Sequence, residues 1–201
     1  MPNNFPPLAL RYGESSLEAG LDEAGRGCLA GPVVAAAVML PDQVDLPGLT
    51  DSKLLSHARR LQLRELILEQ AEAWCVGMSS AQRIDEVNIL QATYDAMHEA
   101  IAGLPVKPEL LAIDGHQFRP FPEIDHVCLV KGDRRFLNIA AASILAKTYR
   151  DELMIMLDAE YPGYGWATNK GYPTRAHKVA IQSQGVTPFH RETFNWELKE
   201  E

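Results

Sequence analysis

The sequence is poor in cysteine and has no hydrophobic run long enough to span a bilayer. Its three cysteines, Cys28, Cys75 and Cys128, are an odd number without the spacing of a metal site, which predicts a reduced, cytoplasmic protein. The first ten residues contain prolines and no basic segment, so we expect no signal peptide. Internal repeats and low-complexity segments are also missing. These absences leave an ordinary soluble globular protein, with no membrane partner.

Basic residues are outnumbered, because 19 Lys and Arg face 27 Asp and Glu and give a net charge of −8. Taken over the whole chain, this balance argues against a nucleic-acid partner. Residues 131–191 differ: nine Lys and Arg against five Asp and Glu give +4, which leaves −12 for the rest. That basic third could hold phosphates, although ordinary scatter of charge explains the same distribution.

The hydrophobic pattern predicts strands that alternate with helices in a single α/β domain of 201 residues. Alternation at 17–22 places Asp22 on the face of a strand opposite its apolar face, and this strand is expected to form a hairpin with the apolar run 33–40. Further strands are expected at 74–79, 110–113 and 127–130. Helices are expected at 56–72, 84–101 with a break near Glu86, 138–160 and 174–184, with a loop over 163–173.

Three of the expected strands lead into acidic residues, namely Asp22-Glu23, Asp114 and, after Lys131-Gly132, Asp133. If these strands are parallel neighbours, their acids meet at one edge of the sheet, where ligand sites of α/β proteins lie. A single acid at a strand end is more simply a solvated loop residue, but three in one short chain favour a site. Oxygen ligands without His or Cys favour Mg²⁺ or Mn²⁺. The pattern predicts a phosphate or phosphodiester enzyme that uses two metal ions.

At these residues the sequence resembles bacterial ribonuclease HII. The resemblance rests on nine segments in the family's order between about Gly20 and Phe194: Asp22–Gly27 with Leu29–Ala37, Asp51–Lys53, Asn88–Thr93, Ile113–Gly115, Lys131–Asp133, Ala140–Lys147, Asn169–Thr174 and Pro188–Arg191. It implies an RNase H-like fold, with a central five-stranded mixed sheet flanked by helices and a helical C-terminal part. The core would cover about residues 15–160 and the C-terminal segment 161–201 of one catalytic domain.

The resemblance also implies an activity and a site. The activity is hydrolysis of the RNA strand of RNA–DNA hybrids and incision 5′ to single ribonucleotides in duplex DNA, leaving 5′-phosphate and 3′-hydroxyl ends. The catalytic metal ligands would be Asp22, Glu23, Asp114 and Asp133, which are the acids already selected at the strand ends. A monomer that takes up Mg²⁺ or Mn²⁺, two ions during catalysis, is expected.

Substrate-binding residues follow from the same resemblance. The backbone of Gly25, Arg26 and Gly27 would sense the ribonucleotide 2′-hydroxyl, the group that separates RNA from DNA. Tyr172 would pack on the sugar of the next nucleotide and prefer DNA there. The candidate phosphate contacts are Lys53, Ser143, Lys147 and Arg150, the last three at helical spacing. His190 is interpreted as a structural hydrogen-bonding residue.

The sequence departs from the resembled pattern at two places. Cys28 stands where proline is frequent, and Arg134-Arg135 follow Asp133 where a serine is often seen. Two other classes compete with the nuclease: a Mg²⁺-dependent junction resolvase or phosphatase, and a non-catalytic hybrid-binding protein. The first needs no sensor such as Gly25–Gly27, and the second would gain by losing negative charge beside phosphate.

Overall fold

The computed structural model describes residues 7–197, so 1–6 and 198–201 of the predicted domain lie outside the described residues. A five-stranded mixed sheet lies at its centre in the order β3-β2-β1-β4-β5. The strands are β1 (Glu18–Ala24), β2 (Val33–Met39), β3 (Ala73–Ser79), β4 (Leu110–Asp114) and β5 (Asp125–Leu129). β1 pairs antiparallel with β2 and parallel with β4, which pairs parallel with β5. The expected hairpin and the expected parallel neighbours are both confirmed.

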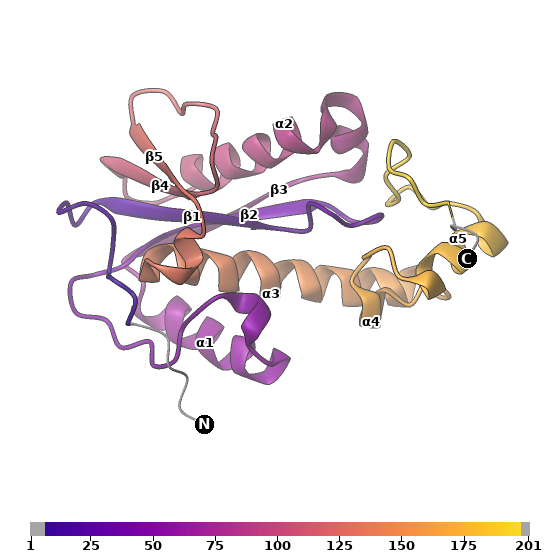
Figure 1. The fold of residues 1–201 in the computed structure, drawn as a ribbon, viewed down its shortest axis with the longest axis horizontal. Coiled ribbons are helices and arrows are strands. Elements are labelled where there is room, and N and C mark those ends of the chain that lie inside the picture. Colours follow the sequence, from indigo (N-terminus) through magenta and orange to yellow (C-terminus); the bar gives the residue numbers. More distant parts are fainter. Residues whose placement is uncertain (1–6, 198–201) are drawn as a thin grey trace.

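Helices cover both faces of this sheet, as Figure 1 shows, with α2 on one face and α3 with α1 on the other. Their bounds are α1 (His57–Gln70), α2 (Ala81–Ala102), α3 (Leu137–Glu160), α4 (Trp166–Asn169) and α5 (Arg175–Gln184). Two short 3₁₀ turns, η1 (Ser52–Leu54) and η2 (Gly132–Arg134), complete the set. The helix α4 falls inside the stretch predicted as a loop, because a single helical turn has no readable periodicity. No helix within residues 7–197 is long and apolar enough to cross a membrane.

The helix α2 is broken at Asn88, two residues beyond the predicted break at Glu86. Asn88 has φ 71° and ψ 164°, which no helical residue adopts. Its side-chain Oδ1 accepts hydrogen bonds from the backbone N–H groups of Leu90 and Gln91, at 3.0 and 3.2 Å. Asn88 therefore acts as the cap of the second half of the helix.

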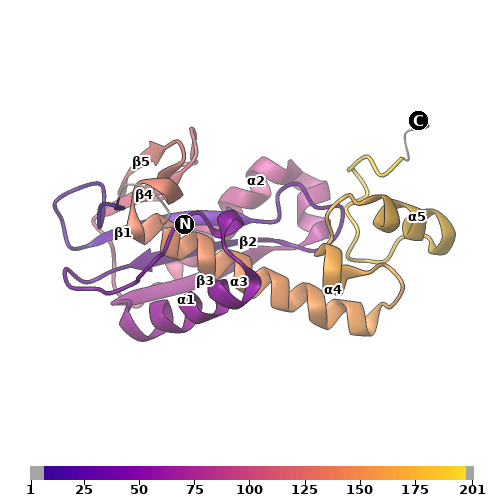
Figure 2. The same ribbon diagram turned by 60° about the horizontal axis from the view of Figure 1, so that its bottom comes forward.

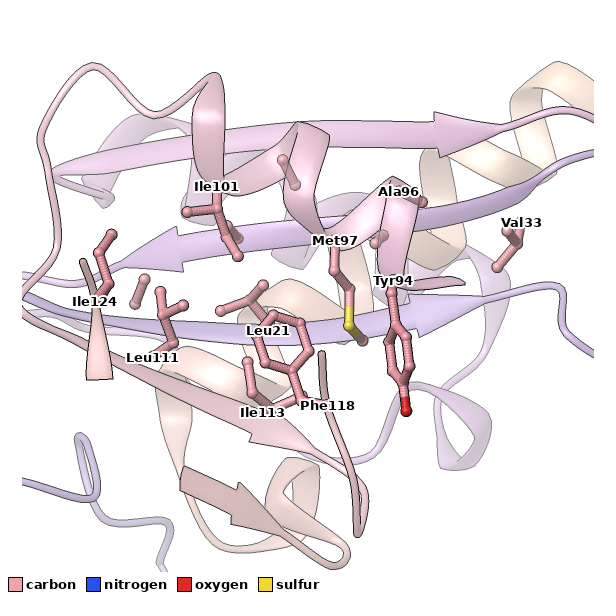
Figure 3. Packing of buried hydrophobic residues seen from close by; sticks show 14 of the residues in the cluster. Leu21, Val33, Tyr94, Ala96, Met97, Ile101, Leu111, Ile113, Phe118 and Ile124 are labelled. Atoms are coloured by element: carbon pink, nitrogen blue, oxygen red, sulfur yellow. The ribbon is translucent and has the colours of Figure 1, made fainter. Parts of the chain in front are cut away.

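Strand β1 is buried on both faces, so it lies in the middle of the core. On the α2 face, Leu21 packs with β4 residues such as Leu111 and with Met97 of α2 (Figure 3). On the α3 face, Gly20 touches the first turn of α3, and a Cβ there would collide with the backbone of Asn138 and Ile139. This close approach brings the end of β1 against α3 and places Asp22 on the α3 face, opposite Leu21.

The C-terminal part is a smaller unit built on the second half of α3. In Figures 1 and 2, α4 and α5 lie beyond the end of the sheet. They enclose their own apolar cluster, in which Trp166 and Ile181 pack against Leu29, Met154 and Leu157. This cluster joins the C-terminal part to the loop that connects β1 and β2.

Candidate active site

The predicted acids lie at one edge of the sheet because three parallel strands end there. Asp22 lies near the end of β1, Asp114 is the last residue of β4, and Asp133 lies in η2, shortly after β5. Asp22 is 6% exposed and Asp133 is 7% exposed, while Asp114 is half-buried. Four carboxyl groups, counting Glu23, thus share a largely buried edge.

These carboxylates accept few hydrogen bonds for their burial. Asp22 Oδ1 accepts the backbone N–H of Glu23 at 2.7 Å, and Asp114 Oδ1 accepts that of Gly132 at 2.8 Å. Glu23 forms an ion pair with Arg26, with 3.0 Å between Oε1 and Nη1. The cluster is therefore only partly neutralised by the protein.

The pKa values of the acids are raised because their negative charges are only partly neutralised. Burial raises the pKa of Asp22 well above its ordinary value, and the charges of Glu23 and Asp114 raise it further. Burial also raises the pKa of Asp133 to about 6, with Asp114 and Asp51 adding to the effect. Shifts of this kind, from burial and like charge in one cleft, are typical of functional sites.

The donor set suits a hard divalent cation. It consists of oxygen atoms alone, which favours Mg²⁺ or Mn²⁺ over zinc, and a cation would relieve the repulsion among the acids. Within residues 7–197, no group of three or more His, Cys, Asp or Glu residues is arranged closely enough to hold a metal ion as it stands. The fit therefore rests on donor chemistry and charge.

A cleft of about 290 Å³ adjoins the acids and gathers most of the predicted site. It is lined by Asp22, Glu23, Ala24, Gly25, Arg26, Gly27, Ser52, Lys53, Ser143, Lys147 and Tyr172. Asp114 lines a second, smaller hollow, which also includes Glu23 and Arg26 in its wall. Carboxylates, a glycine-rich turn, two lysines and an aromatic ring thus border one cavity, although they come from distant parts of the chain.

The turn at residues 25–27 is held from behind by a buried arginine. Arg191 is fully buried, and its guanidinium donates to the carbonyl oxygens of Gly25 at 2.7 Å, Arg26 at 2.9 Å and Gly31 at 2.9 and 3.0 Å. Gly25 has φ +95°, and a Cβ there would collide with the side chain of Arg150. The turn needs glycine both for its backbone conformation and for this close contact.

Arg150 does not fit the expected role of a phosphate contact. It is 1% exposed. Its three guanidinium nitrogens donate to the carbonyl oxygens of Ala30, Pro32 and Lys170, at 2.8 to 2.9 Å. Helical spacing correctly placed it on the face of Ser143 and Lys147, but Arg150 is buried and each of its guanidinium nitrogens already donates to a carbonyl oxygen of the protein.

Tyr172 borders the cleft on the loop after α4. Its side chain faces Lys147, whose ammonium lies 5.6 Å from the ring centroid and 2.7 Å from Asp151. The carbonyl oxygen of Tyr172 accepts a hydrogen bond from Nδ1 of the buried His177 at 3.0 Å. This bond fixes the loop that presents the ring.

The two buried histidines form one network in the C-terminal part. Trp166 Nε1 donates to His177 Nε2 at 2.9 Å, and His190 Nε2 lies 3.2 Å from the same nitrogen. His190 Nδ1 accepts the backbone N–H of Thr187 at 2.9 Å. Both rings are therefore neutral, and the interpretation of His190 as a structural residue agrees with its burial.

Sequence reasoning missed Asp51 and Arg134 as neighbours of the acid cluster. Asp51 is 2% exposed and its carboxylate binds Arg134, with 2.7 Å between Oδ2 and Nη2. Of the segment Asp51-Ser52-Lys53, the resemblance predicts a role for Lys53 alone. Nothing local in the sequence connects Asp51 with a residue so far along the chain.

An edge of parallel strands with clustered carboxylates, in a five-stranded mixed sheet flanked by helices, defines an RNase H-like enzyme. Residues 19–197 match the family model described as Ribonuclease HII. Ribonuclease HII of Parabacteroides distasonis is 55% identical over 188 residues, which cover 93% of this chain and 94% of the relative. That of Porphyromonas gingivalis is 56% identical over 188 residues, with the same coverage. The chain belongs to the ribonuclease HII family and is a ribonuclease H.

Solved structures agree with this assignment. Ribonuclease H2 from Pyrococcus horikoshii superposes with a TM-score of 0.76 at 25% identity, covering 89% of this chain and 94% of that one. The RNase HII of Archaeoglobus fulgidus, solved in a complex with PCNA, gives 0.75 at 29% identity and covers 92% and 96%. RNase HIII in complex with Mn²⁺ shares the fold, with a TM-score of 0.64 at 22% identity, covering 89% and 67%. The family assignment favours the nuclease over the resolvase, phosphatase and non-catalytic alternatives.

Proposed function

We propose that this ribonuclease H cleaves the RNA strand of RNA–DNA hybrids and cuts 5′ to single ribonucleotides embedded in duplex DNA. The products carry 5′-phosphate and 3′-hydroxyl ends. One observation carries the proposal: the carboxylates that end β1 continue directly into the turn of Gly25–Gly27, and both line the cleft that Tyr172 borders. The enzyme acts as a monomer of one catalytic domain, in the cytoplasm.

Asp22, Glu23, Asp114 and Asp133 are the proposed ligands of Mg²⁺ or Mn²⁺, with two ions present during catalysis. When bound, such ions activate water and neutralise charge on the leaving oxygen. The raised pKa values of Asp22 and Asp114 support this role, because buried acids that repel one another gain from a cation between them. Arg26 keeps Glu23 beside the turn through their ion pair.

Recognition of the ribonucleotide is assigned to the backbone of Gly25, Arg26 and Gly27. A 2′-hydroxyl both donates and accepts hydrogen bonds, so main-chain groups held in one conformation can read it. The hydrogen bonds from Arg191 to the carbonyl oxygens of Gly25 and Arg26 supply that rigidity. A turn fixed before the substrate arrives loses less entropy on binding than a mobile one.

The remaining cleft residues are assigned to the nucleic-acid backbone. Tyr172 packs on the sugar that follows the ribonucleotide, where a 2′-hydroxyl would crowd its ring. Lys53, Ser143 and Lys147 contact phosphates. All three line the same cleft as Asp22, Glu23 and Tyr172, so a strand bound there would contact them.

The test is cleavage of a DNA duplex that contains one ribonucleotide, with Mg²⁺ or Mn²⁺, beside an all-DNA duplex and a reaction with EDTA. We expect one cut, on the 5′ side of the ribonucleotide, only when metal is present. No cut there, together with activity on branched DNA or on small phosphate esters, would overturn the proposed substrate and leave only the carboxylate cluster in place.

A further inference from the structure

Arg134 joins two segments that border the acid cluster from different parts of the chain. Its Nε and Nη2 both donate to Oδ2 of Asp51, at 3.1 and 2.7 Å. One partner belongs to η2, after β5, and the other is the residue that precedes η1. The side chain of Asp51 is 3% exposed, while that of Arg134 is 48% exposed. The pair is thus anchored inside the protein at one end and open to solvent at the other.

The other oxygen of Asp51 sets the position of Lys53. Oδ1 accepts the backbone N–H of Lys53 at 2.9 Å and thereby begins the η1 turn. The turn is fixed on its other side by Ser52, whose Oγ lies 3.0 Å from Oγ of Ser143 on α3. Lys53 itself is exposed and lines the cleft. The carboxylate of Asp51 thus binds the backbone N–H of Lys53 through Oδ1 and the guanidinium of Arg134 through Oδ2.

The buried negative charge of Asp51 requires a positive partner, and Arg134 is that partner. Asp51 is buried beside Asp114 and Asp133, and its charge contributes to the raised pKa values of both. Without Arg134, a third buried carboxylate would repel these two, and movement of Asp51 towards solvent would take the η1 turn with it. Arg135 offers a natural contrast, because its guanidinium lies 5.0 Å from the ring centroid of Phe136 instead.

We propose that Arg134 is a positioning residue for nucleic-acid binding, which acts through Asp51 to hold Lys53 where a phosphate of the cleaved strand binds. The inference rests on the proposed function, since it names how one phosphate contact of that cleft is placed. It also gives a role to an arginine at which this chain departs from the resembled pattern.

The experiment measures binding of a fluorescent DNA duplex with one ribonucleotide to the full chain, in EDTA, over a range of salt concentrations. Lys53→Ala removes one phosphate contact and is expected to weaken binding about fivefold to tenfold and to reduce the slope of log Kd against log salt by about 1. Arg134→Gln is expected to have the same two effects. Combined, the substitutions should weaken binding no more than Lys53→Ala alone, because both act on one contact.

Control variants separate positioning from charge and from folding. Arg135→Gln removes the neighbouring positive charge and is expected to change the affinity less than twofold. Arg134→Lys, which keeps a charge near Asp51, is expected to restore part of the affinity. Arg134→Gln combined with Asp51→Asn leaves no unpaired buried charge, and the amide oxygen introduced at position 51 can still accept the N–H of Lys53. We therefore expect this double variant to be folded and to recover affinity relative to Arg134→Gln.

Three results would overturn the inference: wild-type affinity in Arg134→Gln, equal losses in Arg134→Gln and Arg135→Gln, or full additivity of Arg134→Gln and Lys53→Ala. In multiple-turnover cleavage, Arg134→Gln should raise KM and leave kcat within about twofold. A wild-type enzyme that binds the duplex but does not cut it would defeat the proposed function alone, because the binding comparison needs no cleavage.

Discussion

Two regions of this molecule bury charged and polar groups, and they treat them in opposite ways. In the C-terminal part, each guanidinium nitrogen of Arg150 and Arg191 donates to a carbonyl oxygen, and His177 and His190 are joined to Trp166 and Thr187. At the end of β1, buried carboxylates repel one another, which raises the pKa of Asp22, and they accept few hydrogen bonds.

The contrast separates structural from functional burial of polar groups. A buried group with every partner in place rigidifies its surroundings, and removing one partner costs stability. Buried groups of like charge destabilise the fold when nothing compensates them, and such groups cluster at functional sites. The acids have the uncompensated charge that the proposed metal site requires, while the arginines hold the backbone beside them in place.

The largest expected effect comes from Asp22→Asn. It removes one of the repelling charges, so we expect cleavage to fall by at least about 1,000-fold, while the melting temperature in EDTA stays the same or rises. Asp42→Asn serves as the matched control, because the side chain of Asp42 is 79% exposed and pairs with Arg11. If the Asp22→Asn variant still cleaves the substrate, or is clearly less stable than wild type, Asp22 has a structural role and not a catalytic one.

Arg191→Met should lower stability, in contrast to Asp22→Asn. It leaves the carbonyl oxygens of Gly25, Arg26 and Gly31 without their donor, and we expect the free energy of unfolding to fall by about 3 kcal/mol. Denaturant titration measures this change. Arg175→Met, at an exposed position at the start of α5, should change stability by less than about 0.5 kcal/mol. Similar losses in both variants would mean that the hydrogen bonds of Arg191 contribute nothing special.

The smallest expected effect is a difference in acid sensitivity. Burial lowers the pKa of His190 to about 4, with the neighbouring His177 adding to the effect. The unfolded chain therefore takes up a proton at this histidine below about pH 6.5, whereas the folded chain takes it up only below about pH 4. The free energy of unfolding therefore decreases as the pH is lowered from about 6.5 to about 4. For His190 alone, the loss between pH 7.5 and pH 5 is about 2 kcal/mol.

The acid cluster responds to pH with the opposite sign, which makes a variant comparison necessary. Since the pKa of Asp133 is raised to about 6, protonation stabilises the metal-free protein as the pH falls. Unfolding of wild type and His190→Asn in EDTA, at pH 7.5 and pH 5, isolates the histidine contribution. The variant should lose about 2 kcal/mol less than wild type over this range. Identical pH dependence in the two proteins would show that His190 is not kept neutral by the fold.

The sequence alone predicts the strands of the sheet and the position of the acids at the ends of those strands. Strand-forming runs that end in Asp22, Asp114 and Asp133 are local signals, and the tendency of parallel strands to present their carboxyl ends together converts them into a site. The β1–β2 hairpin and the four longer helices followed from periodicity in the same way. The predicted break in α2, near Glu86, lies two residues before the observed break at Asn88. Asn88 caps the second half of the helix through its side chain, and the spacing of apolar residues does not reveal such a cap.

The partners of the buried arginines and of Asp51 could not be predicted. Arg134 and Asp51 are separated by 83 residues, and Arg191 and Gly25 by 166, so no local pattern connects them. For the same reason the sequence predicts a phosphate contact at Arg150: helical spacing gives the face of the helix, but only the fold shows that this side chain is buried and bonded to carbonyl oxygens. Long-range satisfaction of polar groups depends on packing, which hydrophobic periodicity does not encode.

The hydrogen bonds of Arg191 also bear on the order in which the molecule becomes competent during synthesis. The four acids and the sheet beneath them are complete once the ribosome has passed Asp133, whereas the turn at residues 25–27 waits for a residue made 166 positions after Gly25. Until Arg191 is made, the carbonyl oxygens of Gly25, Arg26 and Gly31 lack the guanidinium that donates to them in the folded protein. On the proposed function, this turn is therefore completed after the acids are in place.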